Sequence, residues 1–280
     1  MFIFRKAAQL TDFLSGTDRP TGFIPTMGAL HEGHRSLLLR AAVDGHLTVV
    51  SIFVNPTQFN DPADFNKYPV TTTEDLKMLQ DSHCDAVYLP ALEDVYPQGT
   101  DQMPVFDFGS LETILEGARR PGHFRGVGQV VARLLEIVAP QHLYLGQKDY
   151  QQCMIISDLI RQKNLPTRLH ICPTVREDDG LALSSRNRRL SPAERSRAGV
   201  IYQCLVSIEA KRHTTAFSIV AQECEALLQH KGFEVEYVAL VDADTLTLLP
   251  DYDSGRRMVA LIAARLGTTR LIDNLILSTD

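Results

Sequence analysis

Two histidines separated by three positions are the sharpest chemical feature of this 280-residue sequence. They are His31 and His34, in the segment PTMGALHEGH at residues 25–34, which follows a predicted strand and opens a predicted helix. Residues three apart share one face of a helix, and neutral imidazoles can donate to phosphate oxygens without adding permanent charge. A helix N-terminus adds backbone N–H groups that attract anions. The segment predicts a phosphate site; the alternative is two surface histidines at an ordinary helix start.

A second polar segment, GQKDYQQ at residues 146–152, also follows a predicted strand. Ligands in open α/β sheets bind beyond the carboxyl ends of the strands, where this segment falls. Lys148 can meet phosphate charge, Asp149 can accept from a ribose hydroxyl or orient Lys148, and Gln152 lies one turn further on. An exposed helix start with an ion pair is the alternative.

A third segment, LSSRNRRL at residues 183–190, places Ser184 and Ser185 beside Arg186. A guanidinium can fork onto two phosphate oxygens, so this triplet is typical of a phosphate clamp. Ser/Arg-rich linkers are also often merely solvated, and that interpretation stays open.

Two further segments indicate recognition of smaller polar groups. IFVNPTQF at residues 52–59 puts the amides of Asn55 and Gln58 at the end of an apolar strand, where they suit hydroxyl and carboxylate recognition. RRPGHFRGV at residues 119–127 is expected to be a loop that contacts an anion. An ordinary turn and a surface loop, respectively, are the alternatives.

Three phosphate-type segments predict a nucleoside triphosphate more than a dinucleotide. The sequence has no G-x-G-x-x-G after a predicted strand and no G-x-x-x-x-G-K-[ST]. Dinucleotide binding of the Rossmann type and Walker-type phosphate binding therefore both lose support.

The elements that position these segments alternate between strands and helices over the first two thirds of the chain. Predicted strands cover residues 21–25, 47–54, 85–89, 143–145 and 167–171, and predicted helices cover 33–44, 74–80, 127–138 and 150–162. This alternation is typical of βαβ units around a parallel sheet.

The pattern changes after Pro173, where an Arg-rich polar stretch leads into helices at 192–212 and 214–230 and then β-rich runs at 235–241 and 258–264. We expect an α/β parallel-sheet domain over 1–175 and a smaller α+β domain over 176–280.

Composition excludes several classes of protein. The chain has 28 Lys and Arg against 34 Asp and Glu, and its 44% hydrophobic and 22% charged residues are close to average soluble usage, which excludes disorder, collagen and coiled coil. The acidic balance argues against a large nucleic-acid footprint. No apolar run is long enough for a membrane span, and Arg5 and Lys6 follow the first apolar residues, the reverse of a signal peptide. A cytosolic protein is expected.

The five cysteines are an odd number without a C-x-x-C motif. Their spacing predicts neither a metal site nor a disulfide framework, so we expect buried structural thiols.

Together, the segments PTMGALHEGH, SIFVNPTQF, GHFRGV, GQKDYQQ and DGLALSSRN, in that order, closely resemble the pantothenate synthetase (pantoate–β-alanine ligase) family. This family is related to the nucleotidyltransferases and class I aminoacyl-tRNA synthetases. The motif resemblance covers about residues 21–190, and the rest is similar only in length and general pattern. It implies a Rossmann-like N-terminal domain, a smaller C-terminal lid domain and a homodimer.

The same resemblance implies a reaction and its site. ATP, with Mg²⁺, drives the ligation of (R)-pantoate to β-alanine through a pantoyl-adenylate, releasing AMP and pyrophosphate. The implied ATP site consists of Met27, Gly28, Ala29, Leu30, His31, Glu32, Gly33, His34, Gly146, Gln147, Lys148, Asp149, Val175, Leu183, Ser184, Ser185 and Arg186.

Roles within this set follow the resemblance. We assign His31, His34, Lys148, Ser184, Ser185 and Arg186 to the triphosphate, with His34 as the proton donor. Pantoate is expected at Gln58 and Gln152, with Gln58 also near β-alanine, and the pocket lining adds Asn55, Tyr68 and Arg120. No residue is assigned as a metal ligand.

The sequence departs from the family pattern at two positions. Leu183 stands where methionine is common, a change that conserves volume, and Gln147 stands where glutamate is common, which removes a negative charge beside Lys148. Another adenylyl-transferring enzyme, such as a phosphopantetheine adenylyltransferase, remains an alternative, although such chains are typically much shorter. A tRNA synthetase would need an anticodon-binding extension. A catalytically silent nucleotide-binding module is the third alternative.

Overall fold

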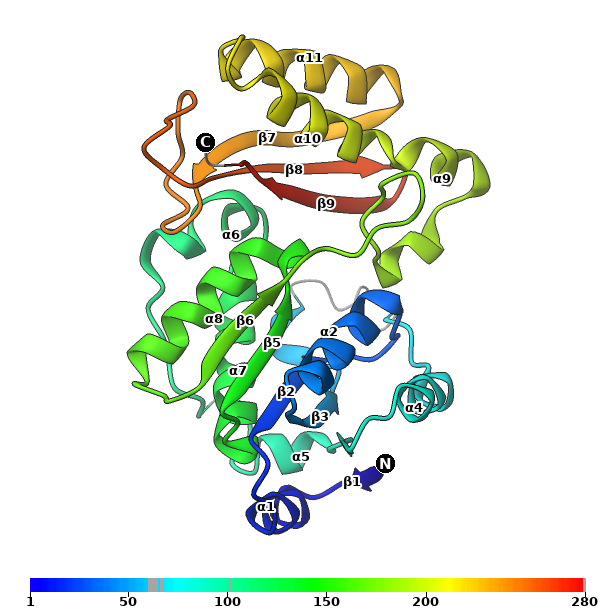
Figure 1. The fold of residues 1–280 in the computed structure, drawn as a ribbon, viewed down its shortest axis with the longest axis vertical. Coiled ribbons are helices and arrows are strands. Elements are labelled where there is room, and N and C mark those ends of the chain that lie inside the picture. Colours follow the sequence, from blue (N-terminus) through cyan, green and yellow to red (C-terminus); the bar gives the residue numbers. More distant parts are fainter. Residues whose placement is uncertain (60–64, 66–67, 101, 279–280) are drawn as a thin grey trace. The chain divides into compact units, whose positions relative to one another are not determined.

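The structure is a computed structural model that describes residues 1–59, 65, 68–100 and 102–278. It contains two compact units (Figure 1). The N-terminal unit comprises Met1–Gly146 and Gln151–Cys172, and the C-terminal unit comprises Gln147–Tyr150 and Pro173–Asp280.

The N-terminal unit is built on a six-stranded parallel sheet in the order β1-β4-β3-β2-β5-β6. Its strands are β1 (Phe2–Phe4), β2 (Thr21–Thr26), β3 (Leu47–Ile52), β4 (Ala86–Tyr88), β5 (His142–Gly146) and β6 (Arg168–Cys172). Its longer helices are α1 (Ala7–Ser15), α2 (Glu32–Val43), α4 (Thr72–Asp81), α7 (His123–Val138) and α8 (Tyr150–Gln162). Short helical segments are η1 (Pro56–Gln58), α5 (Leu92–Val95), η2 (Gly109–Glu112) and α6 (Leu115–Arg119). The expected α/β parallel-sheet fold is confirmed.

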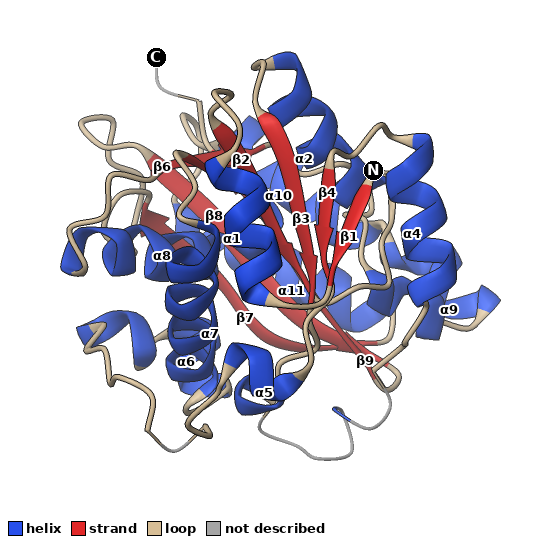
Figure 2. Cartoon of the chain, turned by 90° about the horizontal axis from the view of Figure 1, so that it is seen from below, coloured by secondary structure: helices blue, strands red, loops and turns tan. Residues whose placement is uncertain are grey.

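Helices cover both faces of this sheet (Figure 2). Phe23 and Val49 pack with residues of α1, α7 and α8, whereas the next residues along the same strands, Ile24 and Val50, pack with residues of α2 and α4. Successive side chains of a strand point to opposite faces, so a strand covered twice must be apolar throughout. This explains the nearly continuous apolar run at 47–54.

The strand order reverses direction between β2 and β5. From β2 the chain adds β3 and then β4 on one side, whereas β5 pairs with the other side of β2 and is followed by β6. Such a switch point opens a crevice outside the carboxyl ends of the strands, where ligands of open α/β sheets bind. The segments that begin at Met27 and Phe53 leave the sheet at this edge, and β5 ends there at Gly146.

The C-terminal unit is a three-stranded antiparallel sheet in the order β7-β8-β9, with helices on one face. Its strands are β7 (Phe233–Asp242), β8 (Met258–Leu266) and β9 (Thr269–Ile276), and its helices are α9 (Pro192–Ala198), α10 (Val200–Lys211) and α11 (Phe217–His230). The short segments η3 (Gln147–Asp149) and η4 (Ser185–Arg189) also belong to it. The smaller α+β architecture is confirmed.

Several predicted elements need correction. β1, α1 and β9 were not predicted. The helix expected over 192–212 is two helices that meet at Gly199, where an added Cβ would lie 2.8 Å from the Asp179 carbonyl oxygen. The loop expected over 119–127 is shorter than predicted: Arg119 ends α6, residues 120–122 form a turn, and residues 123–127 already belong to α7.

Candidate active site

The turn after β2 is shaped by two consecutive residues with left-handed backbone. Gly28 has φ = 80° and Ala29 has φ = 49°, a region that costs an L-residue conformational energy. The carboxylate of Asp75, from the first turn of α4, accepts hydrogen bonds from Ala29 N at 3.0 Å and Leu30 N at 2.8 Å. Asp75 is 3% exposed, so these bonds are shielded from water. Nothing in the sequence singles out Asp75, because a carboxylate in a first helical turn is ordinarily explained by the helix dipole.

The two histidines lie at the start of α2 and cap it reciprocally. His31 Nδ1 accepts from Gly33 N at 3.2 Å, and His34 Nδ1 accepts from His31 N at 3.3 Å. Their ring centroids are 4.2 Å apart. The expectation that both lie on one helical face needs correction, because His31 is the N-cap and has extended backbone. Since both Nδ1 atoms accept, each neutral ring carries its proton on Nε2 and can donate from that atom.

The amides expected to hold the smaller substrate form a connected, buried group after β3. Asn55 is 1% exposed, and its Nδ2 lies 3.3 Å from Gln58 Oε1 and 3.3 Å from Gly126 O. Tyr96 donates to Asn55 Oδ1 at 2.9 Å, and burial raises the pKa of Tyr96 to about 12, so its hydroxyl stays protonated. Gln58 Nε2 lies 2.9 Å from Met27 Sδ, which links these amides to the turn after β2.

A histidine that was not assigned a role supports this group from α7. His123 Nδ1 lies 2.8 Å from Gln58 O, and its Nε2 lies 2.9 Å from Arg120 Nη1. An arginine can only donate, so His123 accepts at Nε2 and donates from Nδ1 to the carbonyl. Arg120 therefore reaches the segment that carries Gln58 through His123. The quoted motif GHFRGV contains His123, but its spacing gave no reason to choose it.

The other two candidates for the smaller substrate lie on separate elements of the same unit. Gln152 is half-buried in the first turn of α8. Its neighbour Gln151 is buried and donates to Leu111 O at 2.7 Å, so Gln151 has a structural role. The ring of Tyr68 packs edge-on against Phe59, with centroids 5.7 Å apart.

The remaining candidates for the ATP site belong to the C-terminal unit, apart from Gly146. Lys148 lies in η3, and its Nζ is 3.8 Å from Asp149 Oδ1. Ser184 caps η4, because its Oγ accepts from Arg186 N at 3.2 Å. This capping places Ser185 and Arg186 in the first turn of η4.

A short hairpin leads into η4 and carries the two other candidates of this unit. Leu183 N donates to Val175 O at 3.0 Å, and the neighbouring pair Arg176 and Ala182 forms an antiparallel bridge. Val175 and Leu183 are therefore held directly opposite each other, and Leu183 immediately precedes Ser184.

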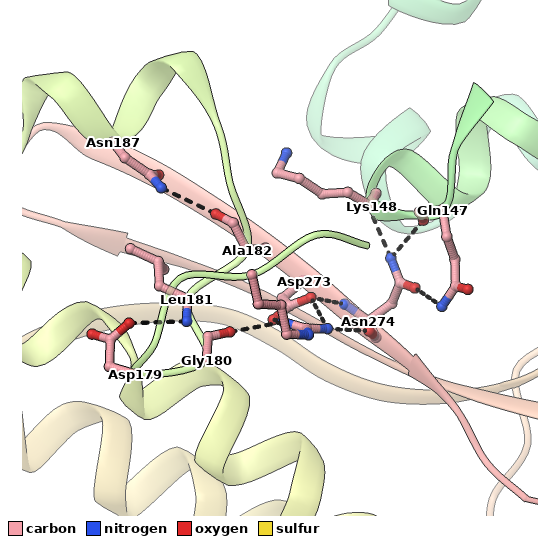
Figure 3. A network of polar contacts seen from close by, with 10 residues as sticks. Gln147, Lys148, Asp179, Gly180, Leu181, Ala182, Asn187, Asp273 and Asn274 are labelled. Carbon is pink, nitrogen blue, oxygen red and sulfur yellow. Dashed lines mark hydrogen bonds and ion pairs between the residues drawn. The ribbon is translucent and has the colours of Figure 1, made fainter. Parts of the chain in front are cut away.

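A polar network that no sequence motif indicates holds both the Lys148 turn and the hairpin before η4 (Figure 3). Asn274 of β9 contacts Gln147 and Lys148. Asp273 accepts hydrogen bonds from the guanidinium of Arg176, a residue of the first strand of the hairpin. Burial raises the pKa of Asp273, and the charge of Arg176 opposes that rise. The sequence gives no sign of this network. Side chains alternate between the two faces of a strand, so the neighbouring residues Asp273 and Asn274 are not expected to act together.

Metal sites, membrane spans and disulfides are absent from the part of the chain that the structure describes. Within residues 1–59, 65, 68–100 and 102–278, no group of three or more His, Cys, Asp or Glu side chains is placed to hold a metal ion. No helix in those ranges is both long and apolar enough to cross a bilayer. All five cysteines lie in the described part and are buried, as expected, and none of them forms a disulfide.

Comparisons with known proteins agree on one family. The Pantoate-beta-alanine ligase family model matches residues 2–276, beyond the 21–190 over which the motifs resemble the family. Pantothenate synthetase of Dehalococcoides mccartyi is 45% identical over 264 residues, 92% of this chain and 96% of that protein. The chain also resembles the crystal structure of pantothenate synthetase from Thermus thermophilus, with a TM-score of 0.92, 39% identity and coverage of 98% of this chain and 99% of that one.

A third relative is a solved structure whose description names ligands. Pantoate-beta-alanine ligase from Francisella tularensis, complexed with beta-gamma ATP and beta-alanine, matches with a TM-score of 0.82, 34% identity and coverage of 99% of this chain and 97% of that one. A match over nearly the whole chain, at this identity and with the same fold, leaves one conclusion. The chain belongs to the pantoate–β-alanine ligase family.

Proposed function

We propose that this chain ligates (R)-pantoate to β-alanine at the expense of ATP, through a pantoyl-adenylate. The observation that carries the proposal is the turn 27–34 at the switch point of the sheet, where two capped histidines present Nε2–H donors beside a helix N-terminus. Family membership supports the same reaction. ATP, pantoate and β-alanine are its small-molecule substrates.

In the first step, a pantoate carboxylate oxygen attacks the α-phosphorus of ATP. The new oxygen–phosphorus bond forms as the bond to the β-phosphate breaks, and pyrophosphate leaves. Both reactants are anions, so the protein must neutralise charge and align them. We assign this work to His31, His34, Lys148 and Arg186, with Ser184 and Ser185 donating to phosphate oxygens. The carboxylate is itself the nucleophile, so no protein nucleophile is needed.

In the second step, the neutral amine of β-alanine attacks the carbonyl carbon of the adenylate. AMP leaves as the amide bond forms, and the amine loses a proton. We place Gln58 and Gln152 on pantoate, with Gln58 also near β-alanine and Asn55, Tyr68 and Arg120 lining the pocket. Because an acyl-adenylate hydrolyses in water, we further propose that the C-terminal unit acts as a lid that closes on bound nucleotide.

Mg²⁺ is part of the proposal as a companion of the triphosphate. Mg²⁺ sites are commonly built from substrate phosphates, waters and one or two carboxylates. No residue of the chain is assigned as a ligand of this ion. When bound, Mg²⁺ would neutralise charge on the phosphate oxygens.

We also propose a cytoplasmic homodimer, on the basis of the family resemblance. A monomeric mass in light scattering would contradict the dimer. The acidic composition supports the expectation that nucleic acid is not a partner.

The deciding experiment is ATP–pyrophosphate exchange with purified protein, Mg²⁺ and pantoate, without β-alanine. Exchange that requires pantoate is expected, and addition of β-alanine should then release AMP and pantothenate. ATP binding without pantoate-dependent exchange would refute the proposed reaction and favour a different acyl substrate or a silent relative.

Lys148→Ala should reduce this exchange by about 10²-fold or more, the scale for losing a preorganised electrostatic partner. Lys77→Ala is the matched control, because Lys77 is an exposed lysine on α4. Equal rates for the two variants would remove Lys148 from the mechanism.

A further inference from the structure

One asparagine of the last strand holds the turn that carries Lys148. Asn274 Nδ2 donates to Gln147 O at 3.0 Å and to Lys148 O at 2.9 Å, and its Oδ1 accepts from Gln147 Nε2 at 3.1 Å (Figure 3). An asparagine side chain has two N–H donors and one acceptor oxygen, and all three groups are used here. Asn274 is 1% exposed, so water does not compete for these bonds.

These contacts involve the backbone of Lys148 and not its ammonium. Figure 3 shows the Lys148 side chain extending away from Asn274, while the carbonyl of the same residue is bonded to it. Asn274 is therefore placed to fix the direction in which the lysine leaves its turn, without using the charge.

The backbone of Asn274 is fixed in turn by a buried ion pair. Asp273 Oδ1 accepts from Asn274 N at 2.7 Å, and Arg176 Nη2 donates to Asn274 O at 3.2 Å. Arg176 also forks onto Asp273, with Nη1 to Oδ2 at 2.6 Å and Nη2 to Oδ1 at 3.0 Å. Asp273 is 4% exposed, and a bidentate pair of this kind has a defined geometry.

Arg176 also fixes the hairpin that ends at Ser184. Its Nη1 donates to Gly180 O at 3.0 Å, its guanidinium lies 4.0 Å from the centroid of the Tyr202 ring, and its backbone bridges Ala182. Chain segments 97 residues apart in sequence, at Arg176 and Asp273, are thus bonded to each other within the C-terminal unit.

We propose that Asn274 is a positioning residue for Lys148, and that the Arg176–Asp273 pair holds Asn274 and the hairpin together so that Lys148 and Ser184–Arg186 keep a fixed spacing. Under the proposed function, both segments bind one triphosphate, and the network sets the distance between their charges. The inference rests on that function for its kinetic consequence, but the mechanical link is testable without it.

The kinetic test compares three variants in pantoate-dependent ATP–pyrophosphate exchange. Asn274→Ala should lower kcat by about 10- to 100-fold, the scale of a displacement of about 1 Å at a catalytic group. The KM for pantoate should stay within about twofold, since Asn274 acts on Lys148 and not on the pantoate residues. Asn274→Asp has the same size but lacks both donors, so it should lose as much as Asn274→Ala. Wild-type kcat in Asn274→Asp would show that Asn274 only fills space and would overturn the proposal.

Glu236→Gln is the matched control for loss of stability. Glu236 of β7 pairs with Arg270 of β9 at 2.9 Å in the same sheet, outside the network. The Glu236→Gln variant should have lower thermal stability but a kcat within about twofold of wild type, because the substitution changes no contact of the Lys148 turn. A fall in kcat in Glu236→Gln equal to that in Asn274→Ala would show that general destabilisation is the cause.

Hydrogen–deuterium exchange of the substrate-free protein keeps the two proposals separate. In Asn274→Ala, the amides of residues 147–149 should exchange at least about tenfold faster than in wild type and in Glu236→Gln, because the turn loses its anchor. If wild-type protein shows no ATP–pyrophosphate exchange, the proposed function fails and this measurement alone decides the positioning role. Unchanged exchange at 147–149 in Asn274→Ala would overturn it.

Discussion

At the scale of single residues, His34 combines two tasks on opposite sides of one ring. Its Nδ1 accepts from His31 N and completes the start of α2, whereas its proton lies on Nε2. A neutral imidazole in this arrangement is a donor of fixed orientation, which is what charge developing on a phosphate oxygen requires. The two tasks can be separated by replacing each ring nitrogen in turn.

We expect His34→Asn to separate capping from catalysis. The shorter amide keeps an acceptor close to the position of Nδ1 but removes the donor at Nε2. Thermal stability should change little, while pantoate-dependent exchange should fall by about 10²-fold. His34→Gln is the converse, because its amide reaches the position of Nε2 but loses the cap. It should keep more activity and lose about 1 kcal/mol of stability. Exchange kinetics and thermal melts check both, and a fully active His34→Asn would show that Nε2 is dispensable.

Asp75 belongs to the same scale, because its single carboxylate holds two backbone N–H groups of the left-handed turn. Asp75→Asn keeps the size of the side chain but turns an N–H₂ group toward one of these donors. We expect a loss of about 1.5–3 kcal/mol, the range for hydrogen bonds to charged groups. Adenylate formation should fall by about tenfold or more, because the turn loosens. Glu74→Gln, an exposed change in the same helical turn, is the control. If both variants behave alike in melts and exchange, Asp75 does not shape the turn.

At the scale of elements, the close approach of α7 to η1 positions the substrate amides. An added Cβ at Gly126 would lie 2.8 Å from Gln58 Cα and closer still to the Thr57 carbonyl oxygen, so only glycine allows this approach. Gly128 lies two residues further along α7 and faces the Phe108 ring, where an added Cβ would lie 2.7 Å away. An alanine at either glycine of α7 would therefore clash with a neighbour, but only the alanine at Gly126 would clash with η1.

Gly126→Ala should displace η1 and weaken binding of pantoate. Overpacking of this kind costs about 1–3 kcal/mol, and we expect a rise in the KM for pantoate of about tenfold with a smaller change for ATP. Gly128→Ala should lose comparable stability but keep a near-wild-type KM for pantoate, since its clash is with a side chain away from η1. Steady-state kinetics of both variants, alongside thermal melts, test this. An equal rise in KM for the two variants would contradict the assignment of η1 to pantoate.

The elements also show how far the fold could be predicted from the sequence. The alternation of strands and helices was sufficient to predict β2 to β6. The apolar signal is strongest in β3, which is buried along its whole length, whereas β6 at the edge of the sheet keeps the exposed Arg168. β9 was missed because the adjacent polar residues Asp273 and Asn274 interrupt its apolar pattern. Both are buried, since their partners come from other parts of the chain.

The candidate site divides in the same way. The residues proposed to meet phosphate lie in short motifs, which sequence can reveal. The residues that hold those motifs in place act over long separations: Asp75 bonds Leu30 across 45 positions, and Asn274 bonds Lys148 across 126. Only a folded chain brings such pairs together, so no local pattern could identify them.

At the scale of the whole molecule, stability should depend on three packed histidines of the N-terminal unit: His46 just before β3, His142 at the start of β5 and His170 in the middle of β6. The rings of His46 and His142 stack with centroids 3.8 Å apart, and His142 Nδ1 lies 2.8 Å from His170 Nε2. Tyr144 bridges His46 Nδ1 at 2.7 Å and Asp44 at 2.8 Å. Burial, and secondly the neighbouring His142, lower the pKa values of His46 and His170 from the ordinary 6.5. The cluster lies away from the turn at 27–34, which follows the carboxyl end of β2.

The lowered pKa values predict a stability that falls as the medium becomes acidic. The unfolded chain takes up these protons near pH 6.5, but the folded chain does so only at lower pH. Stability is therefore complete above pH 6.5 and is lost below it at up to about 1.4 kcal/mol per pH unit for each proton. Urea unfolding followed by circular dichroism between pH 8 and pH 5 measures the slope. His170→Asn should reduce the slope by about one proton, whereas His230→Asn, an exposed change at the end of α11, should leave it unchanged. Carboxylates titrate in both variants, so only the difference between the two pH slopes reports on the histidine cluster. Equal slopes would mean that the packed rings do not resist protonation.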